Sequence, residues 1–343
     1  MPIIGLDLGK YSFRAIEIDE RRGKKVLTGF GTYENPRLDL NSAEKEGYER
    51  YAKSIRGFFS EVGFTTPNVV LGLEETSVFM RIIKVPIMND KDLAKSIHYE
   101  AEQYIPLPLN KVNLSFQKLG VDPKDKERMH VQIVAAKKET LNNQVEIVRK
   151  ANLVPKAIEP QSLAMNRSLL SKSGGTTGTV VLDVGYSGTF IMIEHKGHVR
   201  FTRTLPFGGD TITKSLQQGL KIDYLQAEEH KRVYGMDPSH FDGKVSEIIK
   251  PVINDIIMEL KRASIFFTNN NHGVNIKRVI ISGGTSLMPG FLSYLADNVD
   301  FEVELANPLK GLEISPKLAP KENMLLEAAP MYSVAVGLAL RRI

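Results

Sequence analysis

One short pattern occurs twice in this chain, about half its length apart. Residues 3–18 read IIGLDLGKYSFRAIEI, and residues 179–194 read TVVLDVGYSGTFIMIE. Each copy is an apolar strand that ends in Asp-x-Gly, followed by a polar turn and a second alternating strand, which is typical of a β-hairpin. A repeat at this spacing predicts that each half of the chain is one copy of the same supersecondary unit.

Composition narrows the class of protein. The 343 residues suggest two domains, and 42% hydrophobic with 25% charged residues is typical of a folded soluble protein. The net charge of +5 is small for this length, which favours a mixed surface over a nucleic-acid partner. The absence of cysteine excludes disulfides, zinc-thiolate sites and a catalytic thiol. No run approaches the ~20 apolar residues of a membrane span, so we expect a cytoplasmic chain without direct membrane insertion.

Further elements fit around the two hairpins. Residues 171–178 (SKSGGTTG) read as the connection between the halves. An insertion begins near Ser77 with a strand and continues with a helix capped by Asn89, two strands and a helix from about 140 to 152. This β-α-β-β-α order predicts a small α+β subdomain. In the second half, residues 245–267 predict a long amphipathic helix that Pro251 kinks or restarts.

The first turn, Asp7-Leu8-Gly9, has the chemistry of a phosphate site. Gly9 leaves backbone N–H groups open, and such groups in a turn form an anion-binding concavity. Lys10 adds a positive charge and Ser12 a hydroxyl donor. Asp7 repels phosphate directly, so its natural role is to hold Mg²⁺, which bridges the phosphates. Taken alone, the turn favours an ordinary hairpin with an aspartate at the end of a strand.

The second turn strengthens the phosphate hypothesis. It supplies Asp183 together with two glycines and two hydroxyls. An aspartate at the end of an apolar strand is costly to bury unless it meets a cation. Two such turns facing each other would grip the phosphates from both sides.

Two more segments carry candidate chemistry. In VIISGGTSLMPGF (residues 279–291) a strand runs into a Gly-Gly-Thr turn that a ring or phosphate could approach closely, or that serves packing alone. In IEPQSLAMNRSLL (residues 158–170) Glu159 precedes a helix opened by Pro160. Glu159 either complements the helix dipole or orients an attacking water.

The order GLDLG, EPQSLA, LDVGYSGT, FGGD and ISGGTSLMPG resembles the actin-like ATPase superfamily, which includes actin, sugar kinases, heat-shock chaperones and FtsA. Within it, EAEQYIPLPLNKVNLSF (residues 100–116), the early insertion and the closing AAPMYSVAVGLALR (residues 328–341) resemble the PilM family of type IV pilus assembly proteins. The resemblance implies an α/β, duplicated, two-domain ribonuclease H-like ATPase fold with an inserted α+β subdomain.

The resemblance also implies subdomain boundaries. The first core would comprise residues 1–76, 154–178 and 326–343, and the insertion residues 77–153. The second core would comprise residues 179–212 and 277–325, with a smaller helical subdomain at residues 213–276.

Roles for individual residues follow from the same resemblance, with ATP and Mg²⁺ as the expected cofactors. Asp7 and Asp183 would hold the metal and Glu159 would position water, which makes these three the candidate catalytic set. The other residues implied for nucleotide binding are Gly9, Lys10, Tyr11 and Ser12 in the first loop; Gly185, Ser187, Gly188 and Thr189 in the second; Gly208, Gly209 and Asp210 near the base; Glu228 and Lys231 at the ribose; and Gly283, Gly284, Thr285 and Ser286 in the adenosine motif.

The implied function is a cytoplasmic ATP-binding scaffold at the inner face of the inner membrane, with at most slow ATP hydrolysis and possible self-association. Its partner would be the N-terminal cytoplasmic tail of PilN, docked beside the insertion, with Arg81, Tyr99, Tyr104 and Leu107 as wall residues. One alternative is an FtsA-like cell-division filament protein, although FtsA proteins end in an amphipathic membrane helix and this chain closes with ALRRI. Another is a small-molecule kinase, for which we find no catalytic Asp in a substrate pocket.

Overall fold

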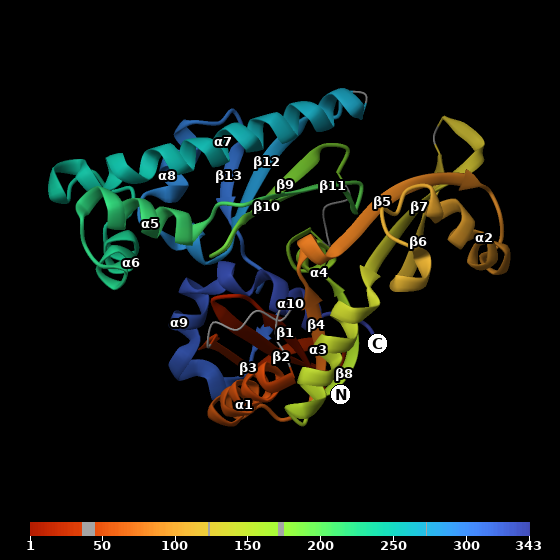
Figure 1. Cartoon of the computed structure of the whole chain (residues 1–343), viewed down its shortest axis with the longest axis horizontal. Coiled ribbons are helices and arrows are strands. Elements are labelled where there is room, and N and C mark those ends of the chain that lie inside the picture. Colours follow the sequence, from red (N-terminus) through yellow and green to blue (C-terminus); the bar gives the residue numbers. More distant parts are fainter. Residues whose placement is uncertain (36–44, 123, 171–174, 272) are drawn as a thin grey trace.

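The computed structural model describes residues 1–35, 45–122, 124–170, 175–271 and 273–343. Two large β-sheets form two lobes, one above the other in Figure 1, and a small third sheet stands beside the upper lobe. Both N- and C-terminal ends of the chain lie at the lower lobe.

The sheet of the first half has the strand order β14-β3-β2-β1-β4-β8. β1, β2 and β3 form an antiparallel meander. β4 pairs in parallel with β1, and β8 pairs in parallel with β4. The strands are β1 (Ile3–Leu8), β2 (Ser12–Arg21), β3 (Lys24–Glu34), β4 (Asn68–Leu73), β8 (Val154–Pro160) and the short β14 (Glu313–Ile314).

The sheet of the second half repeats this arrangement. Its order β11-β10-β9-β12-β13 is again a meander of three antiparallel strands followed by two parallel ones. The strands are β9 (Gly178–Val184), β10 (Thr189–His195), β11 (His198–Leu205), β12 (Ile276–Ser282) and β13 (Glu302–Leu305). The predicted duplication is therefore confirmed, and it extends from the hairpins to whole sheets.

Helices cover both sheets, and one helical layer lies between them. The layer outside the first sheet is α1 (Lys45–Val62) and α3 (Lys138–Lys150). The shared layer is α4 (Gln161–Leu170) and α10 (Ser333–Ala339), with α9 (Glu322–Glu327) beside it. The layer outside the second sheet is α5 (Gly209–Leu220), α7 (Lys244–Asn270) and α8 (Phe291–Asp297), and α6 (Tyr224–Val233) packs on α5.

Strand alternation places the two aspartates on the inner faces of the sheets. Val180, Leu182 and Val184 of β9 pack with the outer helices, so Asp183 faces the shared layer. By the same alternation, Ile4, Leu6 and Leu8 of β1 pack outward, and Gly5 and Asp7 face inward.

The shared layer packs by backbone contact. A Cβ atom on Gly5 would lie 1.9 Å from the carbonyl oxygen of Ala335 in α10. A Cβ atom on Gly337 of α10 would lie 1.9 Å from the carbonyl oxygen of Ala164 in α4. Real Cβ atoms cannot approach so closely, so glycine at both positions lets β1, α10 and α4 stack with their main chains in contact.

The third sheet lies within the first half of the sequence and has the order β5-β7-β6. The predicted helix cap is confirmed, because the Asn89 side chain accepts a hydrogen bond from the Asp92 N–H at 2.9 Å. Leu93, Ile97 and Ala101 of this helix are buried, as their spacing predicts. The elements are β5 (Val78–Pro86), α2 (Asp90–Glu102), β6 (Val112–Asp122) and β7 (Asp125–Lys137). The division of the chain into four subdomains stays a prediction.

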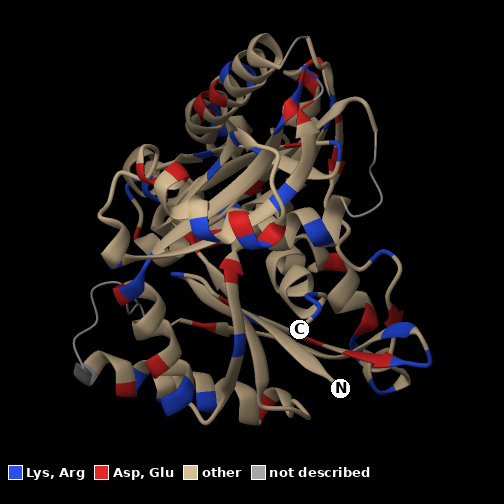
Figure 2. Cartoon of the chain, turned by 90° about the vertical axis from the view of Figure 1, so that its right-hand side faces the viewer, with Lys and Arg blue, Asp and Glu red and all other residues tan. Residues whose placement is uncertain are grey.

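Short 3₁₀ turns complete the chain: η1 (Glu75–Ser77), η2 (Leu109–Lys111), η3 (Phe241–Gly243), η4 (Gly284–Leu287), η5 (Pro316–Lys321) and η6 (Ala329–Tyr332). Pro251 lies inside the continuous helix α7, which excludes the restart among the two predicted alternatives, a kink or a restart. Residues 171–174 of the predicted connection lie outside the described residues. The ribbon in Figure 2 shows positions of acidic and basic residues interspersed along the same elements. Among the described helices, none combines the length and the apolarity needed to cross a bilayer.

Candidate functional site

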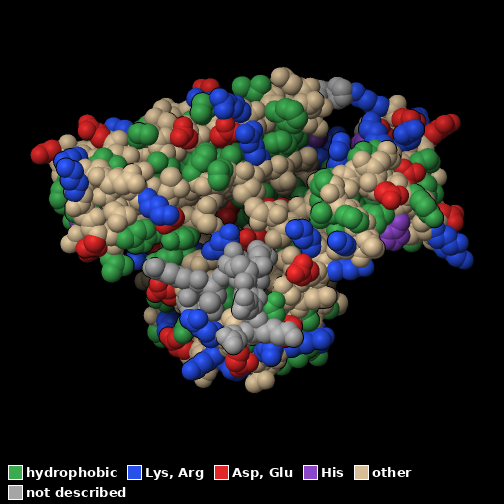
Figure 3. All heavy atoms as spheres, in the orientation of Figure 1, with side chains coloured by type: hydrophobic (Ala, Val, Ile, Leu, Met, Phe, Trp, Pro, Cys, Tyr) green, Lys and Arg blue, Asp and Glu red, His purple; other side chains and the backbone are tan. Residues whose placement is uncertain are grey.

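The two hairpin turns face each other across a cavity of about 480 Å³, which we call the loop cavity. The turn between β1 and β2 and the turn between β9 and β10 form two of its walls, and Figure 3 shows the surface hollowed between the two lobes. Every residue predicted for the two phosphate loops lines it: Asp7, Gly9, Lys10, Tyr11, Ser12, Asp183, Gly185, Ser187, Gly188 and Thr189. The Thr189 hydroxyl, however, donates to the Phe207 carbonyl at 2.8 Å and so serves the loop itself.

Asp7 is buried and held in a defined position. Its Oδ1 accepts a hydrogen bond from Gln161 Nε2 at 2.8 Å, and its Oδ2 lies 3.8 Å from the guanidinium of Arg14. Burial raises the pKa of the Asp7 carboxyl, and the Arg14 charge and the Gln161 amide lower it by less. The negative charge on Asp7 is therefore only partly compensated by the protein.

Asp183, on the opposite turn, experiences the charges of both Asp7 and Arg14. Burial is the main cause that raises the pKa of its carboxyl, and the charge of Asp7 raises it further. A hydrogen bond from Ser282 and the charge of Arg14 act in the other direction. Arg14 thus stands as a shared counterion of both aspartates, and an additional cation between them would be favourable.

Two buried polar atoms at this cavity have no hydrogen-bond partner within the described parts of the chain: the Ser12 hydroxyl oxygen and Arg14 Nε. Ser12 is 4% exposed. A buried donor without a partner is costly, and a phosphate oxygen is an acceptor that could satisfy it.

The carboxylates also suit Mg²⁺ in a particular way. Across the described ranges, no three His, Asp or Glu side chains gather into a group that holds a metal by itself. Mg²⁺ commonly binds through one or two carboxylates, several waters and substrate phosphates. Asp7 and Asp183 would hold the ion, which would neutralise phosphate charge there, so the donor set fits a metal that arrives with a nucleotide.

A second cavity of about 460 Å³, the outer cavity, adjoins the first. Lys231 is buried on its wall and donates to Glu228 at 2.6 Å and to the Thr213 hydroxyl at 2.9 Å. Burial lowers the pKa of Lys231, against the opposing effect of Glu228. Of the residues predicted for the nucleoside, those that line this cavity are Gly209, Glu228, Lys231, Gly284 and Thr285.

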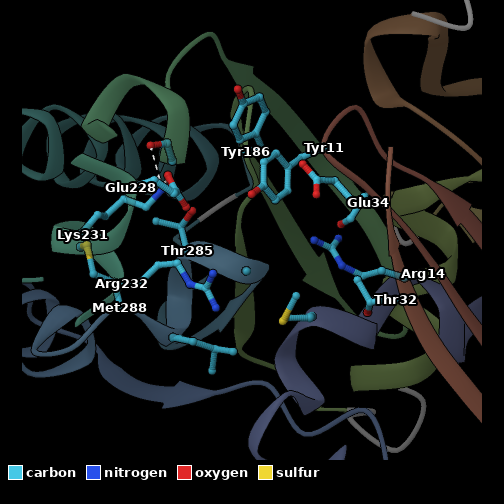
Figure 4. A pocket seen from close by; sticks show the side chains of 15 residues that line it. Tyr11, Arg14, Thr32, Glu34, Tyr186, Glu228, Lys231, Arg232, Thr285 and Met288 are labelled. Carbon is cyan, nitrogen blue, oxygen red and sulfur yellow. Dashed lines mark hydrogen bonds and ion pairs between the residues drawn. The ribbon is translucent and has the colours of Figure 1, made fainter. Parts of the chain in front are cut away.

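Two tyrosines mark the boundary between the cavities. Tyr11 of the first loop stacks on Tyr186 of the second, with ring centroids 4.7 Å apart, and both rings line both cavities. In Figure 4 the pair stands between Glu228, Lys231 and Thr285 on one side and Arg14, Thr32 and Glu34 on the other. The Tyr186 hydroxyl lies 3.1 Å from the Tyr224 hydroxyl, which donates to Asp210 at 2.8 Å. The stack therefore joins the two halves at the cleft.

Several predicted residues support the loops from behind. The Gly209 and Asp210 N–H groups donate to the carbonyls of Gly185 and Tyr186, both at 2.9 Å. The Asp210 carboxylate pairs with Lys214 at 2.7 Å. Of the residues predicted to bind nucleotide, four line neither cavity: Gly208, Asp210, Gly283 and Ser286. Gly283 has φ +89° and packs on the Val184 backbone, and the Ser286 hydroxyl donates to the Gly283 carbonyl at 2.6 Å.

The hypothesis that Glu159 positions water needs correction. Its buried carboxylate accepts hydrogen bonds from Arg167 at 2.6 and 2.9 Å and also from Arg341. It lines neither cavity. Glu159 is therefore occupied in tying α4 to the chain's last residues.

Sequence reasoning missed several residues that line the loop cavity, among them Arg14, Gln161 and Glu75. Arg14 had a signal, because it lies two positions after Ser12 on the same face of β2. Gln161 follows the Glu-Pro pair directly, and it, not Glu159, contacts Asp7. Glu75 has no local signal; its Oε1 accepts from the Ser162 N–H at 2.7 Å, and burial raises the pKa of its carboxyl.

A third cavity, of about 470 Å³, lies beside the three-stranded sheet, and we call it the insert groove. Of the four predicted wall residues, Leu107 lines it. Arg81 instead stacks over the Tyr104 ring at 4.7 Å, and Tyr99 stands 81% exposed on α2. The groove is formed by residues 76–79 of η1 and β5, residues 105–107, Val112, Ala135, Lys137, Glu139, Thr140 and Asn143.

Comparison with known proteins gives one family match over almost the whole chain. The model of the family described as type IV pilus assembly protein PilM matches residues 5–343. The solved structure described as a PilM-PilN type IV pilus biogenesis complex is 26% identical, with a TM-score of 0.85, and the match covers 99% of this chain and 98% of that chain.

More distant relatives share the fold. The cell division protein FtsA of Bacillus subtilis is 23% identical over 98% of this chain and 82% of that protein. The matches to FtsA of Neisseria meningitidis and Borreliella burgdorferi cover only 53% and 54% of those relatives. MreB5 of Spiroplasma citri, solved with AMPPNP bound, is 11% identical with a TM-score of 0.55 over 98% of this chain and 94% of that one. The actin-like fold expected from the motifs is therefore confirmed.

Proposed function

Because this chain belongs to the PilM family of type IV pilus assembly proteins, we propose that it is an actin-like scaffold of the pilus assembly platform at the inner face of the inner membrane. In this role it docks the N-terminal cytoplasmic tail of a PilN protein. The observation that carries the proposal is the family match together with the likeness to a PilM-PilN complex over nearly the full length of both chains.

The insert groove supports this function. β5 is an edge strand of its sheet, paired with β7 on one side, and its first residues Val78 and Phe79 line the groove. An exposed edge offers backbone hydrogen bonds to an extended peptide, and neighbouring pockets select its side chains. The groove combines apolar walls such as Leu107 with the polar Glu139 and Asn143, as peptide sites commonly do.

Peptide titration tests the docking site. We expect Leu107→Glu to weaken binding of a synthetic PilN tail by about tenfold or more, because a charge would have to lose water in an apolar wall. Leu107 is 37% exposed, so the substitution should leave the fold intact. Tyr99→Glu is the matched control, since Tyr99 is 81% exposed and lies outside the groove walls. Equal dissociation constants for the parent and both variants would place the tail elsewhere.

The loop and outer cavities support ATP–Mg²⁺ as the ligand of the cleft. The triphosphate would lie between the two loops, where it could accept hydrogen bonds from the Ser12 hydroxyl and Arg14 Nε. The nucleoside would lie against Glu228 and Lys231 in the outer cavity. Solved MreB5 with AMPPNP shows that the same fold can hold a nucleotide in a related protein.

A thermal-shift measurement tests the nucleotide. At a ligand concentration a hundred times the dissociation constant, binding to the native state alone adds ~2.7 kcal/mol. For domains of this size we expect the melting temperature to rise by roughly 5–10 °C with ATP–Mg²⁺ and by less with ATP in excess EDTA. Protein first shown to be nucleotide-free must be used. An unchanged melting temperature at saturating ATP–Mg²⁺ would remove nucleotide binding from the proposal.

A further inference from the structure

The loop cavity and the insert groove share one wall. Glu74, Glu75 and Thr76 line the loop cavity, and Thr76 and Ser77 line the groove. Thr76 belongs to both. The turn η1 therefore separates the expected triphosphate site from the expected peptide site by the thickness of a few residues.

On the cavity side, the turn is attached to the first loop in two ways. Lys10 Nζ lies 3.9 Å from Glu74 Oε2, directly before the turn. Glu75 accepts from the Ser162 N–H at the start of α4, whose first residue, Gln161, donates to Asp7. A change at Asp7 or Lys10 therefore reaches the turn through no more than two contacts.

On the groove side, η1 continues without a break into β5. Val78 and Phe79 line the groove together with Leu107 and the start of α3. β5 is bound along its whole length to β7. Because Thr76 and Ser77 of the turn themselves line the groove, movement of the turn toward the groove would narrow it even if β5 stays in place.

Lys10 is poised to exchange partners. Its distance to Glu74 lies at the outer limit of an ion pair, and the Lys10 side chain is 44% exposed. Such pairs are weak, and a triphosphate in the same cavity offers a larger negative charge to the ammonium group. The same phosphate would repel the carboxylate of Glu74 on the cavity wall.

We propose that a bound triphosphate draws Lys10 away from Glu74 and displaces the turn Glu75–Ser77 toward the insert groove, so that triphosphate and peptide weaken each other's binding. The proposal rests on the proposed function of both sites. By linkage, the factor by which ATP weakens the peptide equals the factor by which the peptide weakens ATP. ADP lacks the terminal phosphate and should produce a smaller factor.

The test measures the dissociation constant of a labelled synthetic PilN tail by fluorescence anisotropy. The full chain is used without nucleotide, with ADP–Mg²⁺ and with AMPPNP–Mg²⁺. We expect AMPPNP–Mg²⁺ to raise the dissociation constant about fivefold or more, the lower range of measured couplings. Glu74→Gln removes the ion pair but keeps Lys10 for phosphate, so it should reduce the factor toward one. Lys10→Met at saturating nucleotide should do the same.

The double variant and a remote control complete the design. Because Lys10 and Glu74 act through one contact, Lys10→Met with Glu74→Gln should change the factor no more than either substitution alone. Lys124→Ala, exposed and outside the walls of both cavities, should keep the parent factor.

The outcomes separate the two proposals. Peptide binding with equal dissociation constants in all nucleotide states, in protein that shows a thermal shift with AMPPNP–Mg²⁺, overturns the coupling and leaves the proposed function standing. A parent-like factor in Glu74→Gln also overturns the partner exchange. No peptide binding in any state removes the proposed function and the coupling together. No nucleotide binding removes the coupling and takes the nucleotide out of the proposed function, but leaves the peptide-docking scaffold standing.

Discussion

Replacing Asp7 or Asp183 by alanine is expected to abolish Mg²⁺-dependent nucleotide binding in a protein that remains folded. Both carboxylates line the loop cavity, and each would lose an oxygen ligand of the metal. Loss of residues that merely orient metal ligands already costs about 10–100-fold in metal affinity, so we expect at least the upper end of that range. The measurement is the melting-temperature shift with ATP–Mg²⁺.

Without nucleotide, the Asp7→Ala and Asp183→Ala variants should be at least as stable as the parent protein. The pKa values of Asp7 and Asp183 are raised in the folded protein, mainly by burial. A group with a raised pKa contributes stability that is present below its unfolded pKa, about 4 for Asp, and is lost as the pH rises through the folded value. At neutral pH the two ionised carboxylates therefore destabilise the folded state. Neither alanine variant should have a lower melting temperature than the parent.

A matched control keeps this expectation sharp. Lys124→Ala, on an exposed turn, should show the parent's nucleotide shift. If both aspartate variants bind ATP–Mg²⁺ as the parent does, their assignment as metal-holding residues is wrong. If they melt far below the parent without nucleotide, the aspartates serve the fold instead.

The substitution Gly337→Ala should strongly destabilise the first half of the molecule. The added Cβ atom would lie 1.9 Å from the Ala164 carbonyl oxygen and 2.4 Å from its carbon, so α10 and α4 must separate. α10 lies between the two sheets and packs on β1 through Gly5, which leaves it little room to move. Overpacking of this kind costs about 3 kcal/mol, which corresponds to a fall in melting temperature of roughly 6–12 °C.

Gly57→Ala provides a control with the opposite sign. Gly57 lies in the interior of α1 on an exposed face, and a Cβ atom added there would have the Tyr33 hydroxyl as its nearest neighbour, at 3.9 Å. Alanine favours helix over glycine by about 1 kcal/mol, so the melting temperature should rise by roughly 2–4 °C. The melting temperatures of both variants are measured by calorimetry. A Gly337→Ala variant as stable as the parent would contradict the backbone contacts described for the shared layer.

The two turns that line the loop cavity could be predicted because their signal is local. Asp-x-Gly after an apolar strand predicts a turn. The second copy of the pattern predicts an equivalent turn in the other half of the chain, facing the first. Strand alternation then places Asp7 and Asp183 on inner faces without knowledge of the tertiary structure. It also places Arg14 on the face of Ser12, although Arg14 lies beyond the turn and its role as a counterion depends on the second aspartate.

Other roles depend on contacts between distant parts of the chain. Glu159 has the sequence context of a catalytic acid, but its carboxylate is held by Arg341, 182 positions away. Nothing near Glu75 in the sequence indicates that it meets the start of α4. Gly5 and Gly337 read as ordinary apolar-segment glycines until the backbones that they contact are known.

The residues predicted to contact the peptide show the same limit. Tyr99 and Tyr104 are the kind of residue that dominates interfaces, yet one is exposed on α2 and the other pairs with Arg81. Leu107 lines the groove, because the chain after α2 folds back against the start of β5. Residue type alone does not separate these three positions.

The stacked pair of Tyr11 and Tyr186 also gives this molecule an optical property. The sequence contains eleven tyrosines and no tryptophan, so the longest-wavelength part of the near-ultraviolet absorption comes from phenol rings without a dominant indole. Two of these rings are in face-to-face contact, each carried by a different half, and one has its hydroxyl next to Tyr224. Separation of the halves would break the stack and change the dipolar coupling of the rings. Near-ultraviolet circular dichroism of the unlabelled protein therefore carries a signal from the opening of the cleft.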